Sequence, residues 1–323
     1  MKHRILSAAT AVVAAVTLLS ACGSGGGSGA SEAVHLDYAY YNPLSLVVRD
    51  QKLLENKGYD VTWVLSSGSN KANEGVRSKA LDFGSTAGSA ALVARANGTP
   101  LKSVDVYSKP EWTALVVGKN SPITALNQLK GKKIAATKGT DPYFFLVQAL
   151  ASVGLTTGDV EIVNLQHPDG KTALERGDVD AWAGLDPYMA QTAQEQGSRL
   201  LYRNVDFNTY GVLNTREDVI AQRGGTVRAV VDAYEQARGW ALAHPDELTA
   251  LLAREAKIPA SVAKEELDRT TLGIDPAPGD TLRTVLSHIV PLLAADNDVK
   301  SADAAQTALT GLLEPSFAQR RSS

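Results

Sequence analysis

Residues 34–65 read VHLDYAYYNPLSLVVRDQKLLENKGYDVTWVL, and this stretch decides the fold class. It begins with a β-rich run over 34–40 and ends with a second one over 61–65. Between them, residues 44–57 carry apolar side chains at helical spacing, namely Leu44, Val47, Val48 and Leu54. A strand, a helix and a second strand in series form the unit from which parallel sheets are built. The stretch therefore predicts an α/β protein.

The same alternation continues through residue 202. Further strands are predicted at 81–84, 102–107, 113–117, 133–137, 161–165, 180–184 and 199–202, with helical runs between most of them. From about Arg216 onward the strands stop, and residues 227–243, 245–255, 261–267 and 281–294 predict helices. The pattern favours a mainly parallel sheet in an α/β architecture with room for two lobes.

Composition excludes several classes of protein. A length of 323 residues leaves room for two domains, and 44% hydrophobic residues is ordinary for a soluble globular chain. With 32 basic and 35 acidic residues, the chain has no basic excess to neutralise a phosphate backbone. We therefore expect no nucleic-acid partner.

The N-terminus reads MKHRILSAATAVVAAVTLLSAC over residues 1–22. Lys2 and Arg4 precede an uncharged apolar stretch that is shorter than the ~20 residues of a membrane-spanning helix, as in a secretory signal. Its end, LSAC, resembles the lipobox of bacterial lipoproteins, in which the signal is cut before a cysteine that carries diacylglycerol. We expect a lipoprotein signal peptide over 1–21, lipid on Cys22 and a flexible Gly/Ser tether over 22–33. The alternative is an ordinary secretory signal that ends near a cysteine by chance.

Motifs for catalysis and metal binding are scarce. One cysteine cannot form an internal disulfide or a thiolate metal site, and no histidine pair has metal-ligand spacing. A lone His167 before Pro168 is expected on a surface loop. Ser85 lies in GSTAG rather than in a nucleophile elbow, and it has no visible general base. We therefore expect no cofactor, no metal and no enzymatic activity.

Small polar residues instead cluster in the loops between predicted strands and the helices that follow them. Four such places are YNP at 41–43, GSN at 68–70, GST at 84–86 and GTD at 139–141. Open α/β sheets bind ligands at the carboxyl ends of their strands, and helix N-termini there favour anions. Helix capping would explain one such loop, whereas four of them indicate a shared cleft. The candidate ligand-binding residues in these loops are Tyr41, Asn42, Ser69, Asn70, Ser85, Thr86, Thr140 and Asp141.

Several motifs resemble the substrate-binding proteins of ABC importers for aliphatic sulfonates and taurine. KNSPI at 119–123, LKGKKIA at 129–135, KGT at 138–140 and GDVDAWAGLDPY at 177–188 are similar to the second lobe of that family. The GST at 84–86 resembles a loop of its first lobe. The similarity runs from about Leu36 to Leu213. It is more specific for the superfamily, which also delivers nitrate and thiamine precursors, than for any one ligand.

The resemblance implies a two-lobed periplasmic-binding-protein fold of type II. The chain would cross between lobes near residues 117–119 and 211–214, so that lobe 1 holds 34–116 and 215–323 and lobe 2 holds 117–214. Ligand binding would close the cleft by a hinge motion.

Three further residues are candidates for the cleft. Trp182, in the VDAW motif, is expected to stack on the ligand, with a place in the core as the alternative. Asp186 either binds a ligand amine or caps the next helix. Trp112, just before the first crossing, either folds over the cleft or packs at the hinge.

The sequence departs from the family pattern at two positions. Leu185 stands where the family often has a second tryptophan. Asp141 follows Gly139-Thr140 in a loop that is usually richer in serine and neutral asparagine. We expect its carboxylate to cap backbone N–H groups of the helix that starts at Pro142, and so to compete with a bound anion. An amine-bearing ligand would be affected less.

With the resemblance, the sequence predicts a monomeric, extracytoplasmic solute-binding lipoprotein on the outer face of the cytoplasmic membrane. It would bind a sulfonate-like organosulfur compound and deliver it to the membrane permease of an ABC importer. The alternatives are a relative that binds nitrate, riboflavin or a thiamine precursor, and a surface lipoprotein with a purely structural role. A relative of the pyrimidine-precursor synthases is disfavoured, because those enzymes use Cys- and His-containing motifs and this chain carries an export signal.

Overall fold

A computed structural model describes residues 31–318, and the predictions for the signal peptide and Cys22 lie outside these residues. The strands are β1 (Ala33–Tyr38), β2 (Asp60–Leu65), β3 (Phe83–Ala87), β4 (Leu101–Pro110), β5 (Thr113–Val117), β6 (Lys133–Ala136), β7 (Glu161–Asn164), β8 (Ala181–Leu185), β9 (Arg199–Tyr202), β10 (Gly211–Arg216) and β11 (Thr270–Thr271). The α-helices are α1 (Pro43–Asp50), α2 (Ser69–Arg77), α3 (Gly88–Ala96), α4 (Asp141–Ala151), α5 (His167–Arg176), α6 (Tyr188–Gln196), α7 (Glu217–Gln222), α8 (Gly224–Ala243), α9 (Pro245–Ala256), α10 (Ala260–Asp268), α11 (Asp280–Ala295) and α12 (Ala302–Leu312).

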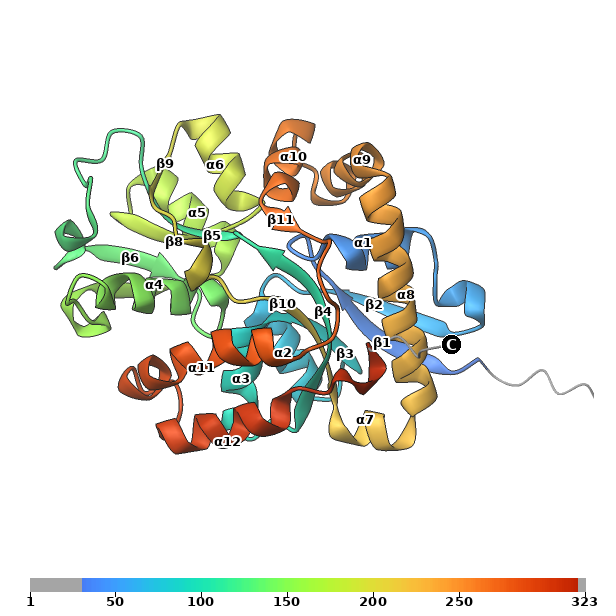
Figure 1. Ribbon diagram of the computed structural model, residues 1–323. Coiled ribbons are helices and arrows are strands. Elements are labelled where there is room, and N and C mark those ends of the chain that lie inside the picture. The colour runs from blue at the N-terminus through green and yellow to red at the C-terminus, as the bar shows by residue number, and fades with distance from the viewer. Residues whose placement is uncertain (1–30, 319–323) are drawn as a thin grey trace, which may run out of the picture. The chain divides into compact units, whose positions relative to one another are not determined.

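The strands form two sheets, one in each lobe, and the fold is therefore α/β and two-lobed. The first sheet has six strands in the order β11-β4-β10-β3-β1-β2, and the second has five in the order β7-β6-β8-β5-β9 (Figure 1). The chain passes from the first sheet to the second between β4 and β5, and it returns between β9 and β10. Because β5 belongs to the second sheet, the first passage lies a few residues before 117–119.

Both sheets are mixed, which corrects the expectation of a mainly parallel sheet. β1 pairs in parallel with β2 and β3, whereas β10 runs antiparallel to both β3 and β4. In the second sheet β6 is parallel to β7 and β8, and β5 is antiparallel to β8 and β9. The antiparallel strands β5 and β10 are those that follow the two passages between sheets. Strands also do not stop at Arg216, since β11 pairs with the end of β4.

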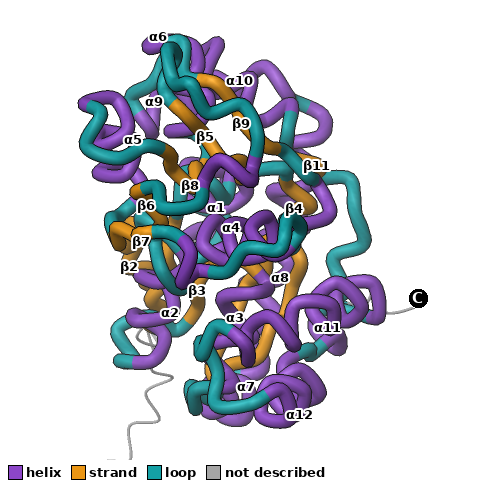
Figure 2. Tube along the Cα trace, turned by 90° about the vertical axis from the view of Figure 1, so that its left-hand side faces the viewer, coloured by secondary structure: helices purple, strands orange, loops and turns teal. Residues whose placement is uncertain are grey.

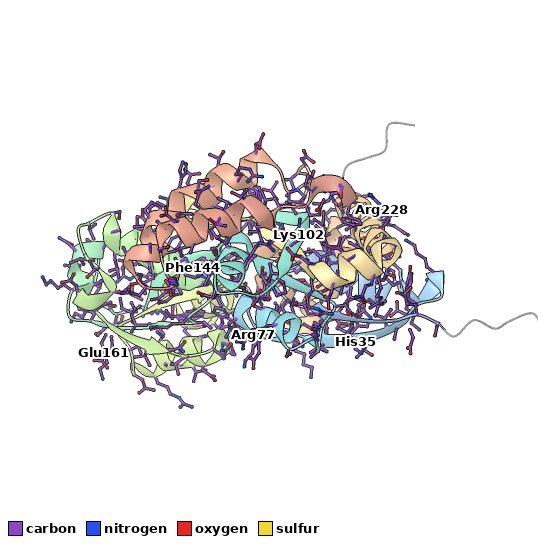
Figure 3. All side chains as sticks on the ribbon, turned by 90° about the horizontal axis from the view of Figure 1, so that it is seen from below. His35, Arg77, Lys102, Phe144, Glu161 and Arg228 are labelled. Carbon is purple, nitrogen blue, oxygen red and sulfur yellow. The ribbon has the colours of Figure 1, made fainter. Side chains whose placement is uncertain are left out.

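Helices from distant parts of the chain cover the sheets. α3, α11 and α12 pack together on the first lobe, and α8 packs against α1 (Figures 1 and 2). Phe144 of α4 lies close to α11 in Figure 3, and it belongs to a buried cluster that includes Leu286 and Ile289 of α11. Apolar contacts therefore join the second lobe to the C-terminal helices.

Candidate functional site

A small cavity lies where loops from the two lobes meet. Its lining residues are Tyr41, Ser69, Trp112, Thr140, Asp141, Pro142, His167 and Leu185. Apart from Trp112, which lies in the first passage between sheets, each follows the carboxyl end of a strand or ends one. The cavity volume is only about 10 Å³. That is far below the ~300–1,000 Å³ of pockets for drug-sized ligands, and it gives room in this structure for no more than a water-sized group.

Three helices begin at this cavity. The first residues of α2, α4 and α5 are Ser69, Asp141 and His167, and all three line it. The first backbone N–H groups of a helix have no partner within the helix, and the helix dipole makes this end positive. Pro142 of α4 and Pro168 of α5 contribute no N–H, so most of these groups come from α2 and from the first residues of α4 and α5. The arrangement therefore favours a negatively charged group in the cavity.

Asp141 is buried at this place and connects elements of both lobes. Its Oδ1 accepts hydrogen bonds from Ser89 Oγ (2.6 Å) and Thr209 Oγ1 (2.7 Å). Its Oδ2 accepts from Trp112 Nε1 (2.8 Å) and the Thr209 backbone N–H (2.8 Å). Burial raises the pKa of Asp141, and these hydrogen bonds oppose the rise. A carboxylate has about four acceptor positions, so all of them are used.

The bonding of Asp141 differs from the predicted helix cap. The residue is the first of α4 rather than its N-cap, which is Thr140, and its carboxylate accepts from α3 and the inter-sheet segments rather than from α4. Its partners lie far away in sequence, which is why the local motif suggested a cap instead.

His167 is fully buried, and the expectation of a surface loop was wrong. It is the first residue of α5, and its ring Nδ1 lies 3.2 Å from Thr137 Oγ1. The ring Nε2 has no hydrogen-bond partner among the described residues. Burial lowers the pKa of His167 to about 3, so the ring is neutral at physiological pH.

Two aromatic residues form another side of the cavity. The rings of Tyr41 and Trp112 are 5.8 Å apart and nearly perpendicular, and the Tyr41 hydroxyl donates to the Ser85 carbonyl at 3.0 Å. Burial raises the pKa of Tyr41 well above its usual value, so it stays neutral. Trp112 lines the cavity and lies in a passage between the sheets, and both of its predicted roles stay predictions.

Comparison with known proteins identifies the family to which this chain belongs. The model of the NMT1/THI5-like family matches residues 46–248, more than half of the chain. The chain belongs to the NMT1/THI5-like family. Two relatives of similar length carry the name "Putative aliphatic sulfonates-binding protein". The one from Escherichia coli strain K12 is 28% identical over 81% of this chain and 81% of its own length. The one from Bacillus subtilis strain 168 is 28% identical over 80% and 81%.

Solved structures show the same fold. The alkanesulfonate-binding protein SsuA from Xanthomonas axonopodis pv. citri, solved bound to MOPS, matches with a TM-score of 0.77. The match covers 86% of this chain and 99% of that chain at 23% sequence identity. The two-lobed periplasmic-binding-protein fold expected from the sequence is thereby confirmed.

In this NMT1/THI5-like chain, three of the predicted residues, Asn42, Ser85 and Thr86, are buried and do not line the cavity. Ser85 Oγ donates to Asp37 Oδ1 (2.9 Å) and accepts from Asn42 Nδ2 (2.7 Å). Thr86 Oγ1 accepts from Asn214 Nδ2 (2.7 Å). Burial raises the pKa of Asp37 to about 7, although its bonds to Ser85 lower it. Asn42, Ser85 and Thr86 therefore hold the β1 and β3 ends in place.

Trp182 and Asp186, which were candidates for contact with the ligand, do not line the cavity. Trp182 is fully buried in an apolar cluster with Val116, Leu174 and Met189 and does not line the cavity, which favours the core alternative. Asp186 is also fully buried, and both of its oxygens accept from Arg269 Nη1, at 3.1 and 2.9 Å. Its Oδ1 also accepts from the Ala190 N–H in the first turn of α6 at 2.9 Å, although the N-cap of this helix is Pro187.

Sequence reasoning missed Pro142, His167 and Leu185 as lining residues. Asn70 is half-buried beside Ser69 but does not line the cavity. The rule that ligands meet strand ends followed by helix starts could have found His167, because a predicted strand ends two residues before it.

Within residues 31–318, no group of His, Cys, Asp or Glu side chains is placed to hold a metal ion. In the same range, no helix has the length and apolar character of a bilayer span.

Proposed function

We propose that this protein is an extracytoplasmic solute-binding lipoprotein of an ABC importer that binds a sulfonate-like organosulfur compound between its lobes. The bound compound is delivered to the membrane permease. The observation that carries the proposal is the meeting of three helix N-termini at one small cavity. A sulfonate is a compact anion with three acceptor oxygens, and it suits converging backbone N–H groups. The relatives named as sulfonate-binding proteins support the same ligand class.

Anchoring and lobe motion complete the proposal. Cys22 carries the lipid, and residues 22–33 tether the folded part to the outer face of the cytoplasmic membrane. Two or three acyl chains are enough for a stable anchor, since each buried CH₂ contributes ~0.8 kcal/mol. Lobe 1 is formed by 34–116 and 215–323 and lobe 2 by 117–214, the first boundary lying a few residues earlier if it follows the sheets. The lobes close on the ligand, and the protein acts as a monomer.

A thermal-shift screen of the full chain tests this function. Candidate ligands are small alkanesulfonates, taurine, nitrate, riboflavin and thiamine precursors, in Tris chloride without sulfonate buffers. A sulfonate at 100 times its Kd should stabilise the folded state by about 2.7 kcal/mol and raise the melting midpoint by several degrees. A rise with nitrate or a vitamin alone would assign the protein to another ligand class. No rise with any compound would contradict a role in solute binding.

A further inference from the structure

Two loops, one from each lobe, are in contact beside the small cavity. The first connects β2 to α2, and the second connects β7 to α5. Ser67 Oγ of the first loop lies 3.5 Å from Gln166 Oε1 of the second. A Cβ on Gly68 would lie 3.1 Å from His167 Nε2, so the backbone of this glycine packs directly on the ring. The Nε2 edge of His167 is therefore covered by the opposite lobe.

The hydrogen bonds on the other side of the ring show which nitrogen can take up a proton. Thr137 Oγ1 donates its single proton to the Leu165 carbonyl at 2.6 Å. Its 3.2 Å contact with His167 Nδ1 must then be a donation from Nδ1–H to Thr137. Nδ1 therefore carries the hydrogen of the neutral ring, and a second proton binds to Nε2. All three residues belong to lobe 2, so this bonding does not depend on the contact between the lobes.

Nothing that the structure describes around Nε2 is placed to stabilise a proton there. Nε2 is buried without a hydrogen-bond partner, and its ring lies at the N-terminus of α5, where the helix dipole disfavours a cation. Asp141, the acidic residue of the cavity wall, directs its oxygens to other partners, and Tyr41 stays neutral. The charged residues of the surrounding segments are exposed or paired with one another, namely Lys71, Glu74, Lys138, Asp169, Lys171 and Glu175.

We propose that closure of the two lobes requires a neutral His167, so that acidification holds the cleft open and weakens ligand binding. This inference rests on the lobe motion of the proposed function and adds a pH-sensitive device to it. When the lobes separate, Gly68 moves away from Nε2, and water can hydrate a protonated ring. When they close, Gly68 covers Nε2, and a protonated ring would be a buried charge without an acceptor. Closure must therefore release the proton.

The sign of the pH dependence follows from the pKa of His167 in the two arrangements. Burial lowers this pKa to about 3 in the structure, whereas an exposed histidine has a pKa of about 6.5. The closed arrangement is therefore most favoured above pH ~6.5, and it loses stability relative to the open one as the pH falls below that value. Between pH 7.5 and 5.5 the neutral fraction of an exposed ring falls about tenfold, and the affinity should fall by the same factor.

Calorimetric titration of the full chain with 1-propanesulfonate, at pH 7.5 and 5.5 in Bis-Tris chloride, tests this inference. The sulfonate group is ionised at both pH values, and the Kd of the wild type should rise about tenfold on acidification. His167→Asn keeps an amide donor near the Nδ1 position and cannot be protonated, so its Kd should change much less. His288→Gln changes an exposed histidine of α11 and should show the same tenfold rise as the wild type.

Other buried groups that titrate near this range, such as Asp37 and Asp186, are present in all three proteins, so the comparison cancels their contribution. An equal rise of the Kd in the wild type and His167→Asn would overturn the inference. Tighter binding of the wild type at pH 5.5 would overturn it as well, because the protonated ring would then pair with the bound anion. If His167→Asn does not fold, His167→Gln takes its place, since it cannot be protonated either.

A second measurement separates this inference from the proposed ligand class. If 1-propanesulfonate does not bind, the proposed ligand class fails, and small-angle X-ray scattering of the free protein tests the pH-sensitive closure by itself. The radius of gyration of the wild type should increase between pH 7.5 and 5.5, and that of His167→Asn should not. An unchanged radius in the wild type, or an equal increase in both proteins, would then overturn the inference.

Discussion

Arg269 donates to both carboxylate oxygens of the fully buried Asp186, at 3.1 and 2.9 Å. Asp186 follows β8 in the second sheet, whereas Arg269 follows α10 and precedes β11 of the first sheet. Arg269 also contacts Glu265 of α10, and Gln194 of α6 donates to the same glutamate. The ion pair therefore joins the two lobes beside the cavity.

Arg269→Met should lower the free energy of unfolding by about 3–5 kcal/mol, because it leaves a buried carboxylate without its cation. Burial already raises the pKa of Asp186 to about 6 although Arg269 opposes the rise, and loss of the arginine raises it further. The loss should therefore be larger at pH 8 than at pH 5, where Asp186 becomes protonated. Urea unfolding at both pH values measures this difference.

Arg254→Met, at an exposed ion pair with Asp50, is the control, and it should lower the free energy of unfolding by less than ~1 kcal/mol. Equal losses in the two variants would show that the Asp186 pair contributes no more than a surface pair.

Asp105→Asn should flatten the dependence of stability on pH. Asp105 is fully buried on β4, its oxygens have no hydrogen-bond partner among the described residues, and burial raises its pKa to about 8. Arg238, 3.9 Å away, lowers that pKa, and Glu235 raises it. Because its pKa is raised, the Asp105 carboxyl group holds its proton more tightly in the folded state than in the unfolded state. Protonated Asp105 therefore contributes most to stability below pH 4, and this contribution is lost as the pH rises to about 8.

Urea unfolding between pH 5 and 8 measures the effect. The wild type should lose roughly 1 kcal/mol more per pH unit than the variant over this window. Arg238 keeps Glu235 and three backbone carbonyls as partners, so the substitution does not leave the cation unpaired. Parallel pH curves for the two proteins would show that Asp105 is ionised throughout.

Trp182→Ala should destabilise the fold by ~3–5 kcal/mol and leave the affinity for a sulfonate nearly unchanged. The ring is fully buried among apolar side chains, and it packs so closely that a Cβ on Gly170 would lie 2.6 Å from its Nε1. Denaturant unfolding and calorimetric titration separate the two effects. Trp240→Ala, at a half-buried residue stacked on His244, should cost less. A tenfold loss of affinity without a loss of stability would show that Trp182 contacts the ligand.

Asp141→Asn should lower stability by about 1.5–3 kcal/mol, because an amide accepts at one atom only and turns its NH₂ group toward groups that donate. Its effect on affinity should be similar for anionic and amine-bearing sulfonates, since the carboxylate is fully bonded within the protein. The control is Asp169→Asn, an exposed acidic residue in the first turn of α5, which should stay within ~0.5 kcal/mol of the wild type. Tighter binding of simple sulfonates at unchanged stability would instead support competition between Asp141 and a bound anion.

Cys22→Ser should leave the precursor without lipid and release folded protein from membranes. Detergent-phase partition of cells that express either form measures the anchor. The variant should move to the aqueous phase, and its ligand-induced thermal shift should be unchanged. Equal partition of the two forms into the detergent phase would contradict lipidation at this residue.

The sequence by itself determined the order of the strands β1 to β9 and of most helices, and it pointed to four residues that line the cavity. It did not predict β10, β11, α7 or α12. β5 and β9 have the predicted bounds, and the rule that ligands meet strand ends led to Tyr41, Ser69, Thr140 and Asp141, all of which line the cavity. These features follow from local patterns: apolar periodicity and small polar residues at the starts of helices.

Only the tertiary structure decided which side chains face the cavity and what each polar group bonds to. His167 is buried because the Gly68 loop packs over its ring, although its sequence neighbours predicted a surface loop. Asp186 and Arg269 are 83 residues apart, and Asp141 and Thr209 are 68 apart. No local pattern encodes such pairs, because their partners meet only when the chain passes from one sheet to the other and back. The same passages place β5 and β10 antiparallel to their neighbours, which the alternation of strands and helices did not reveal.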